Sequence, residues 1–300
     1  MKYALGVDVG GTNIRMAVVS DEGEIVRVIK NRTTPTKNPK ELVDQIAKLY
    51  EEIEPNDFAI EGMGIGVPGP VIQETGYVHF LSNLGIEDFN LKELVEERLN
   101  LKVTVGNDAN LAGFAEAMVG HGKGHRVVQY MTISTGIGGG LIVDGRVISG
   151  STGFAQEIGN MIIDPFSNKK QNDQMAKGSF ESICSGTAIV KSAKEQGLEI
   201  EHAGKLFELA LNGNEIAKKI KKEWLLYMGV ALSSMFAYIE PDVFVLGGGV
   251  MKSSHLFLNE LREEIDKHVF PKLRGKVKVE IAQFDQDAGI IGAALICFSR

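Results

Sequence analysis

The residues with the clearest chemical potential stand where apolar runs end. Asp108 lies in Gly106-Asn107-Asp108-Ala109, between the apolar run Val103–Val105 and an alanine-rich segment. A carboxylate at this place can cap the helix that the following residues predict. It can also act as a general base for phosphoryl transfer, which needs positioning, charge neutralisation and one acceptor for the proton of the attacking hydroxyl. Taken alone, the segment leaves both interpretations open.

Three glycine-rich turns could bind phosphate, because backbone N–H groups converge on an anion most easily where the chain lacks Cβ. They are Asp8–Asn13, Ser134–Gly140 and Gly247–Gly249. A single turn of this kind is more often only a tight hairpin, but three at strand ends favour a nucleotide site. Neither a P-loop nor a dinucleotide fingerprint fits, since no Gly-Lys-Ser/Thr follows and the first turn leads into a strand pattern. Asp8 could orient water around Mg²⁺, and Thr12 could donate to a phosphate.

Composition narrows the class of protein. The chain has 300 residues, 44% hydrophobic and 24% charged, which predicts one large or two medium α/β domains. The net charge of -7 argues against a general binder of nucleic acid or anionic membranes. Cys184 and Cys297 cannot supply a disulfide framework, and no signal-peptide pattern is visible, so a cytoplasmic location is expected. The apolar stretch Leu225–Ile239 falls short of the roughly 20 residues that span a bilayer and predicts a buried helix.

Hydrophobic periodicity predicts an alternating α/β chain in which the unit strand, glycine turn, strand occurs twice, near residues 3–19 and 128–144. Residues 145–172 are expected to be rich in loops. The other expected strands cover residues 59–67, 102–105, 243–246 and 277–281. Helices are expected at 39–54, 91–99, 109–118, 187–195, 203–211, 214–239, 256–268 and 288–297.

The order of motifs along nearly the whole chain resembles the ROK family of bacterial sugar kinases and related repressors, within the actin-like ATPase superfamily. The motifs that carry the resemblance are Asp8–Asn13, Gly66–Pro70, Ser82–Leu84, Gly106–Asn110, Ser134–Gly140, Gly153–Gly159 and Pro241–Gly249. The resemblance implies a two-lobed α/β fold of the actin-like, ribonuclease H-like type, with duplicated sheet units and a cleft between the lobes. One lobe is expected to comprise residues 1–119 and 287–300, and the other residues 120–286.

The resemblance also implies roles for individual residues. Asp108 would take the proton from the 6-hydroxyl of a hexose as that hydroxyl attacks the γ-phosphate of Mg·ATP. The sugar itself would be held by Gly69, Asn83, Asn107, Asp108, Glu157, Asn160 and Glu181. The nucleotide would be bound by Asp8, Gly10, Gly11, Thr12, Asn13, Thr135, Gly136, Gly138, Gly247, Gly248 and Gly249, with Asp8 reaching magnesium through water. A homodimer is implied as well.

The chain departs from the family at its structural zinc site, which reads Gly-His, eleven residues, then Cys-x-Cys-Gly-x-x-Gly-Cys-x-Glu. The spacing is kept, but Asn160 replaces the histidine and Asn172, Gln174 and Ser179 replace the cysteines. Amides and hydroxyls are poor zinc ligands beside thiolate and imidazole, so no structural zinc is expected. Phe180 and Ile183 would then anchor the loop by packing, unless the loop is simply mobile. A further departure is Ile86, where many glucose-using relatives have an aromatic residue.

The substrate and even the class of function stay open at this stage. Glucose is the first choice on family frequency, followed by allose, mannose, fructose and N-acetylmannosamine, because Asn160 stands where a sugar contact is expected. The donor could be ATP or polyphosphate. A non-catalytic sugar sensor is the alternative within the family, although Met1 begins almost directly at the first strand and leaves no room for a helix-turn-helix domain. A structural or filament-forming ATPase is disfavoured by the sugar motifs. Closure of the lobes around the substrates is expected to exclude water.

Overall fold

The computed structural model describes residues 1–173 and 175–299, which divide into two compact units. The first unit comprises residues 1–126, 140–156 and the chain from 283 on. The second comprises residues 127–139 and 157–282. The lobe boundaries expected near residues 120 and 287 stay a prediction.

The first unit is built on a five-stranded sheet in the order β3-β2-β1-β4-β8. The three strands β1, β2 and β3 pair antiparallel, whereas β4 pairs parallel with both β1 and β8. Burial on both faces explains why β1 and β4 read as nearly continuous apolar runs. The strands are β1 (Tyr3–Val9), β2 (Asn13–Ser20), β3 (Ile25–Arg32), β4 (Ile60–Val67) and β8 (Val103–Asn107).

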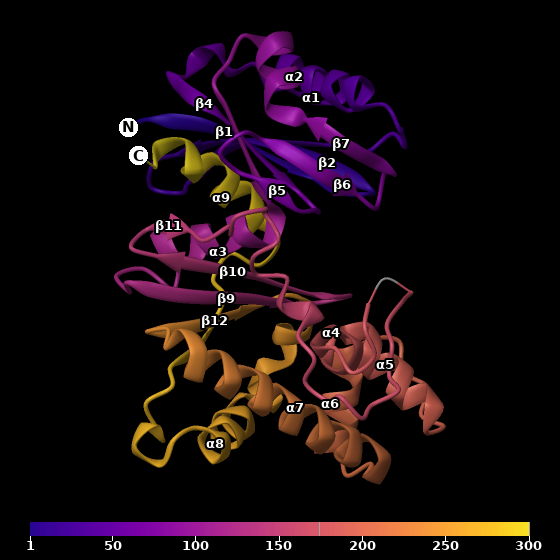
Figure 1. The fold of residues 1–300 in the computed structure, drawn as a ribbon. Coiled ribbons are helices and arrows are strands. Elements are labelled where there is room, and N and C mark those ends of the chain that lie inside the picture. The colour runs from indigo at the N-terminus through magenta and orange to yellow at the C-terminus, as the bar shows by residue number, and fades with distance from the viewer. Residues whose placement is uncertain (174, 300) are drawn as a thin grey trace. The chain divides into compact units, whose positions relative to one another are not determined.

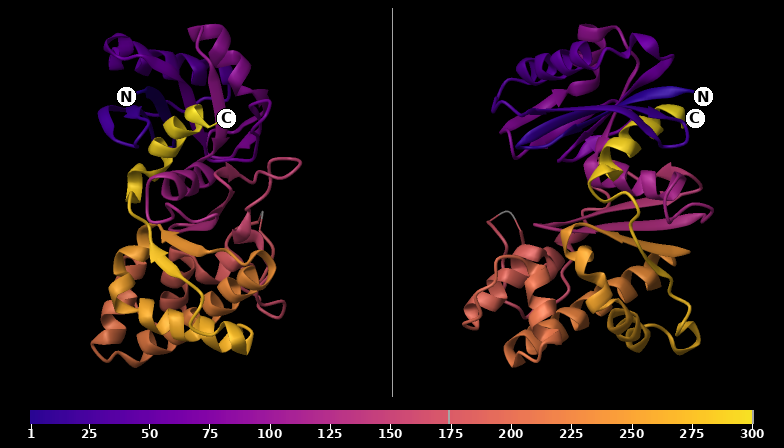
Figure 2. Two further views of the ribbon diagram at one scale, coloured as in Figure 1. Left: turned by 90° about the vertical axis from the view of Figure 1, so that its left-hand side faces the viewer. Right: turned by 180° about the vertical axis from the view of Figure 1, so that it is seen from behind.

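Helices cover both faces of this sheet. The helices α1 (Pro39–Ile53) and α2 (Leu91–Leu99) lie on one face, and α3 (Asp108–Met118) and α9 (Ala288–Leu295) lie on the other, as both views of this unit show (Figures 1 and 2). The side chain of Asn38 caps α1 by accepting from the backbone N–H of Lys40 at 3.1 Å. Expected and observed helix bounds agree within a few residues here.

Close backbone approach fastens α9 to the rest of the unit. A Cβ at Gly292 would overlap the backbone carbonyl of Leu111 in α3, and one at Gly64 would overlap that of Ala293. This close approach leaves no room for even a methyl group, so α9 packs directly on β4 and α3. Glu116, which is fully buried, holds the chain just before α9 by accepting from the N–H groups of Gln283 (2.7 Å) and Phe284 (2.9 Å).

Two parts of the first unit were not expected from the sequence. The strand β3 was not predicted, although its residues alternate between exposed and half-buried, which is the period-two pattern of a strand. A second, three-stranded sheet consists of β5 (Val71–Ile72), β6 (Tyr77–Leu81) and β7 (Ile86–Asn90). Its strands are too short to show a clear period, and they form because each can pair with a neighbour.

The second unit contains the parallel strands β9 (Val127–Ile133), β12 (Val243–Gly247) and β13 (Val279–Ile281), with β12 in the middle. The hairpin strands β10 (Ile137–Val143) and β11 (Arg146–Val147) follow β9, and residues 140–147 belong to the first unit. The helices of the second unit are α4 (Phe180–Cys184), α5 (Gly186–Glu195), α6 (Ala203–Leu211), α7 (Glu215–Ile239) and α8 (Leu258–His268). Short 3-10 helices complete both units: η1 (Pro55–Asp57), η2 (Ile158–Asn160), η3 (Gly249–Leu256), η4 (Pro271–Leu273), η5 (Asp285–Asp287) and η6 (Ile296–Phe298).

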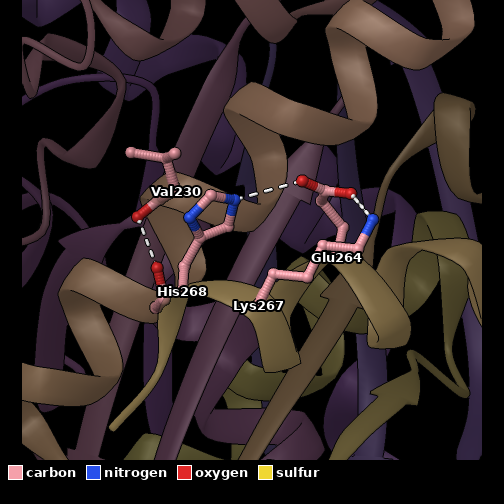
Figure 3. A network of polar contacts seen from close by, with 5 residues as sticks. Val230, Glu264, Lys267 and His268 are labelled. Carbon is pink, nitrogen blue, oxygen red and sulfur yellow. Dashed lines mark hydrogen bonds and ion pairs between the residues drawn. The ribbon is translucent and has the colours of Figure 1, made fainter.

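The long helix α7 includes the stretch expected to be a buried helix, and its buried apolar side chains, such as Trp224, Met228 and Leu232, belong to the core of the second unit. It packs on α8, where Glu264 accepts hydrogen bonds from Lys267 and His268 of its own helix (Figure 3). Burial alone would raise the pKa of Glu264, but these two hydrogen bonds lower it overall. Within residues 1–173 and 175–299, no helix is long and apolar enough to cross a bilayer.

We expect Gly292→Ala to reduce the free energy of unfolding by about 3 kcal/mol, because the added methyl group meets backbone that cannot rotate away. Chemical denaturation of the purified protein measures this. Gly289→Ala is the matched control in the same helix, since a Cβ there has nothing closer than 4.0 Å and alanine favours a helix by up to about 1 kcal/mol. Equal losses of stability in the two variants would contradict the close approach.

Candidate active site

The turn between β1 and β2 is the first of the three glycine turns that the sequence predicts to bind phosphate, and it lies at the surface of the first unit. The N–H of Gly10 donates to the carbonyl of Asn13 at 2.9 Å and closes the turn, while Gly11 and Thr12 are exposed at its tip. Thr33 Oγ1 donates to the carbonyl of Gly10 at 2.7 Å and holds the turn from the side. A Cβ at Gly11 would lie 3.0 Å from Cβ of Asn83, so this predicted sugar residue stands directly beside the turn.

Asp8 stands on β1 just before this turn, opposite Gly66 on β4. Burial raises the pKa of Asp8 above its usual 3.8, the Arg15 guanidinium opposes this rise, and the Asp287 carboxylate adds to it. Arg15 is itself fixed, because it pairs with Asp287 and donates to the carbonyl of Gln286 at 2.9 Å. A poorly solvated carboxylate of this kind suits the water-mediated contact to Mg²⁺ that the sequence predicts.

Asp108 is the first residue of α3, but it is not the residue that caps the helix. Asn107 occupies the N-cap, where its Oδ1 accepts from the N–H of Asn110 at 3.1 Å. The Nδ2 of Asn107 donates to the carbonyl of Gly69 at 3.3 Å, so both ends of this amide contact the protein. The half-buried carboxylate of Asp108 accepts from the N–H of Ala109 at 2.7 Å. The N-cap of α3 is therefore Asn107, and Asp108 is a first-turn residue whose carboxylate bonds to the adjoining backbone.

Gly69 has a packing reason to be glycine, since a Cβ there would overlap the carbonyl of Phe80 in β6. Its contacts with Asn107 and Phe80 join the Gly66–Pro70 segment to β8 and to the small sheet. The parallel register brings Val67, at the end of β4, next to Asn107, at the end of β8. In the first unit the structure thus brings together Asp8, Gly69, Asn107 and Asp108 at the carboxyl ends of neighbouring strands.

In the second unit, Glu181 links the predicted sugar residues to the second glycine turn. Its Oε2 accepts from the N–H of Ile137 at 2.7 Å, and a Cβ at Gly136 would lie 2.5 Å from the same oxygen. Gly159 packs against Glu181 as well, with a Cβ position 3.3 Å from Cβ of Glu181. Loss of water raises the pKa of Glu181, although the Ile137 hydrogen bond lowers it in part. Loss of water likewise raises the pKa of Glu157, and the Glu181 carboxylate adds to the rise.

A pocket of about 570 Å³ opens in the second unit beside the second and third glycine turns. Of the predicted nucleotide residues, Thr135 and Gly249 line it. Ser134, from the second glycine turn, also lines it, and the rest of its wall comes from the start of α5, the start of α6 and the 3-10 helix η3: Gly186, Thr187, Val190, Glu201, His202, Ala203, Gly204, Val250, Lys252 and Ser253. Its volume is in the range of small-molecule sites, and the first turns of two helices favour a bound anion.

The remaining predicted glycines have roles in shaping this wall. Gly248 has φ 90, and a Cβ there would lie 2.5 Å from the carbonyl of Ile133. Gly247 ends β12, where a Cβ would lie 2.7 Å from the Tyr130 hydroxyl. Gly138 lies within β10 and does not line the pocket. Gly247 and Gly248 let β12 end in close contact with β9, and neither is among the residues that line the pocket.

Comparison with known proteins assigns nearly the whole chain to one family. The model of the ROK family matches residues 4–299. The chain belongs to the ROK family. It is 32% identical to a glucokinase of Streptomyces coelicolor, over 98% of this chain and 97% of that protein. It is also 28% identical to the xylose repressor of Bacillus subtilis, over 98% of this chain and 76% of the repressor.

A solved structure is similar over the same extent. The ROK family glucokinase of Streptomyces griseus, in complex with glucose and AMPPNP, is 30% identical, with a TM-score of 0.79 and 98% of each chain covered. The expected fold class, α/β of the actin-like ATPase type, is thereby confirmed.

The residues at the zinc-ligand positions of this ROK protein do not fit a zinc ion. Ser179 Oγ is buried, donates to Ser182 Oγ at 2.7 Å and caps α4, so it serves the helix. Asn160 and Asn172 offer amides, and Gln174 lies outside the described residues. Across the described part of the chain, no cluster of three or more His, Cys, Asp or Glu side chains could hold a metal. Phe180 and Ile183 are buried, as the anchoring prediction requires.

Sequence reasoning missed most of the pocket wall. Glu201 and His202 stand at the start of α6 and lie outside every motif that the sequence predicts. The one available signal was Ser185-Gly186-Thr187, an N-cap followed by a glycine, which marks a helix start that can approach a ligand. The wall itself forms only because α5, α6 and η3 fold against the end of β12.

The cap assignment at Asn107 has a measurable consequence. Asn107→Ala removes the N-cap and the contact to Gly69, and we expect a loss of about 1 to 2 kcal/mol of folding stability. Asp108→Asn keeps the cap, and we expect stability within about 0.5 kcal/mol of the wild type. Urea denaturation of both variants measures the difference. A larger loss for Asp108→Asn than for Asn107→Ala would show that Asp108 is the structural residue.

Proposed function

We propose that this ROK protein is an ATP-dependent hexose kinase with Asp108 as its catalytic base. The observation that carries the proposal is the arrangement at the start of α3: Asn107 is the N-cap of the helix, and the half-buried carboxylate of Asp108 follows directly after the end of β8. Asp108 accepts the proton of the sugar 6-hydroxyl while the hydroxyl oxygen forms its bond to the γ-phosphorus and the bond to ADP breaks.

The proposed sugar-binding residues are Asn83, Asp108, Glu157, Asn160 and Glu181. Carboxylates and amides suit this task, because each sugar hydroxyl both donates and accepts and each must be satisfied when it leaves water. In this proposal Asn107 acts chiefly by fixing Gly69 and α3, since both ends of its amide contact the protein.

The nucleotide half of the proposal rests on the pocket beside Gly249. Its volume of about 570 Å³ suits an adenosine, and Thr135 and Gly136 lie next to it in the second glycine turn. The exposed tip at Gly11 and Thr12 would bind phosphate oxygens. Magnesium would supply charge neutralisation at the phosphates, and Asp8 would hold it through water. ATP is preferred to polyphosphate as the donor because polyphosphate would not use the pocket.

Glucose is the proposed sugar. The glucokinase of S. coelicolor and the glucose-bound structure from S. griseus are at least 30% identical to this chain. Allose, mannose, fructose and N-acetylmannosamine are the other candidates, because Asn160 replaces a histidine at a position that the family uses for the sugar.

Purified protein should consume ATP only when a sugar is present. Asp108→Asn should lower kcat by about 10² to 10⁴, because the hydroxyl loses its proton acceptor, while the melting temperature stays close to that of the wild type. A coupled assay with a panel of aldoses and amino sugars, run with ATP and with polyphosphate, measures both. ATP consumption that ignores every sugar would favour a structural ATPase, and no turnover at all would contradict the kinase.

The raised pKa values of Glu157 and Glu181 predict the acid limb of the pH profile. A carboxyl group with a raised pKa begins to take up a proton at a pH above its usual 4.5, and it then loses its charge and an acceptor site to the O–H that forms. We therefore expect KM for the sugar to rise as pH falls toward that range from neutral. Initial rates at saturating Mg·ATP between about pH 5 and 8 measure it. A KM for the sugar that stays constant down to pH 5 would contradict the role of this pair.

A sugar-sensing regulator is the second candidate, favoured by the similarity to the xylose repressor. Such a regulator would bind sugar through the same residues but would not need Asp108 as a base. Sugar binding measured by calorimetry, together with absence of phosphate transfer to every bound sugar, would favour it over the kinase.

A further inference from the structure

The segment between Asn160 and α4 is closed at its base by backbone hydrogen bonds. The N–H of Phe180 donates to the carbonyl of Met161 at 2.7 Å, and the N–H of Ile163 donates to the carbonyl of Gly178 at 3.0 Å. These bonds place Asn160 and Glu181 at the two adjoining ends of one closed loop. The orientation of both predicted sugar residues therefore depends on how that loop is held.

Two contacts fasten this loop to α7. The Tyr227 hydroxyl donates to Asp164 Oδ2 at 2.7 Å, and Lys169 Nζ lies 2.7 Å from Glu223 Oε1. Glu223 and Tyr227 are four residues apart, so they project from the same face of the helix one turn apart. The ion pair is half-buried, with side-chain exposures of 35% and 36%, which reduces its screening by water. We call these two contacts the α7 clasp.

The helix that carries the clasp is a rigid support. Trp224, next to Glu223, is 2% exposed, and its Nε1 donates to the carbonyl of Cys184 at 2.9 Å at the end of α4. One turn of α7 therefore fixes both the loop and the far end of the helix that bears Glu181. The Asp164 hydrogen bond raises the pKa of Tyr227 to about 12, so the phenol stays a donor at physiological pH.

We infer that Tyr227 and Glu223 are positioning residues for sugar binding: through Asp164 and Lys169 they hold the loop that orients Asn160 and Glu181. This restraint acts on the loop where the resemblance places a zinc site in other family members, and the zinc-ligand types are absent from positions 160, 172, 174 and 179 of this chain. The inference rests on the proposed function, since it concerns the sugar site of that kinase. The clasp touches neither sugar nor nucleotide and acts only through the loop.

The test is a set of single variants assayed as full-length protein with glucose, or with the panel sugar that is turned over fastest. Tyr227→Phe and Glu223→Gln should each raise KM for the sugar about fivefold to tenfold, while kcat and KM for ATP change less than twofold. Tyr238→Phe is the matched control, because Tyr238 is on the same helix but 91% exposed. Asp173→Asn is the control within the loop, since it breaks only the exposed pair with Lys170.

A double-variant cycle separates positioning from general destabilisation. Tyr227→Phe combined with Asp164→Ala should raise KM no more than the more affected single variant, because both remove the same contact. Hydrogen exchange should show faster exchange of the amides at Ile163 and Phe180 in Tyr227→Phe, with α8 unchanged. Additive effects on KM, or an unchanged KM and unchanged exchange, would overturn the inference.

The outcomes also distinguish this inference from the kinase proposal. If the wild type binds glucose by calorimetry but transfers no phosphate, the kinase proposal fails, and the dissociation constant for glucose replaces KM as the measure of the clasp. If exchange is faster in Tyr227→Phe but sugar affinity is unchanged, the clasp holds the loop without positioning the sugar residues, and the inference fails alone. A wild type that binds no sugar of the panel overturns both.

Discussion

Parallel pairing of β1, β4 and β8 is the constraint on which the first unit depends. In a parallel sheet the carboxyl ends of neighbouring strands meet at one edge, and the polar residues that follow them are gathered there. The register sets Asp8 opposite Gly66, and Val67 opposite Asn107. Side chains that are about 100 residues apart in the sequence thus become neighbours, and no local interaction could have brought them together.

Parallel pairing also brings strand ends together in the second unit. There β12 pairs parallel with β9, so Gly247 lies opposite Thr132, and the turns that follow both strands border one pocket. Glu181 then connects that pocket's glycine turn to the loop after Asn160, through its hydrogen bond to Ile137. Glu181, which is predicted to bind sugar, is therefore hydrogen-bonded to the backbone of the turn that is predicted to bind phosphate. The positions of these two predicted subsites thus depend on each other within one unit.

The loop between Asn160 and α4 lacks zinc-ligand residues at the expected positions and is held by other contacts. A metal ion organises a loop through four short bonds from side chains of the loop itself. Here backbone pairing closes the loop, and side chains of α7 hold it from outside. The two solutions place different demands on the sequence: the first requires cysteine and histidine at fixed spacing, and the second requires polar residues one turn apart on a distant helix.

The sequence by itself determined the order of most strands and helices and the motifs that identify the family, because apolar periodicity and glycine turns are local signals. It also located Asp108 at the end of a strand, but not which residue is the N-cap of α3, since Asn107 and Asp108 are both good caps and only the folded backbone chooses between them. Only the tertiary structure revealed β5 to β7, the pocket wall at His202 and the clasp at Tyr227. Each of these depends on pairing or packing between distant segments, and the sequence carries no periodic signal for such contacts.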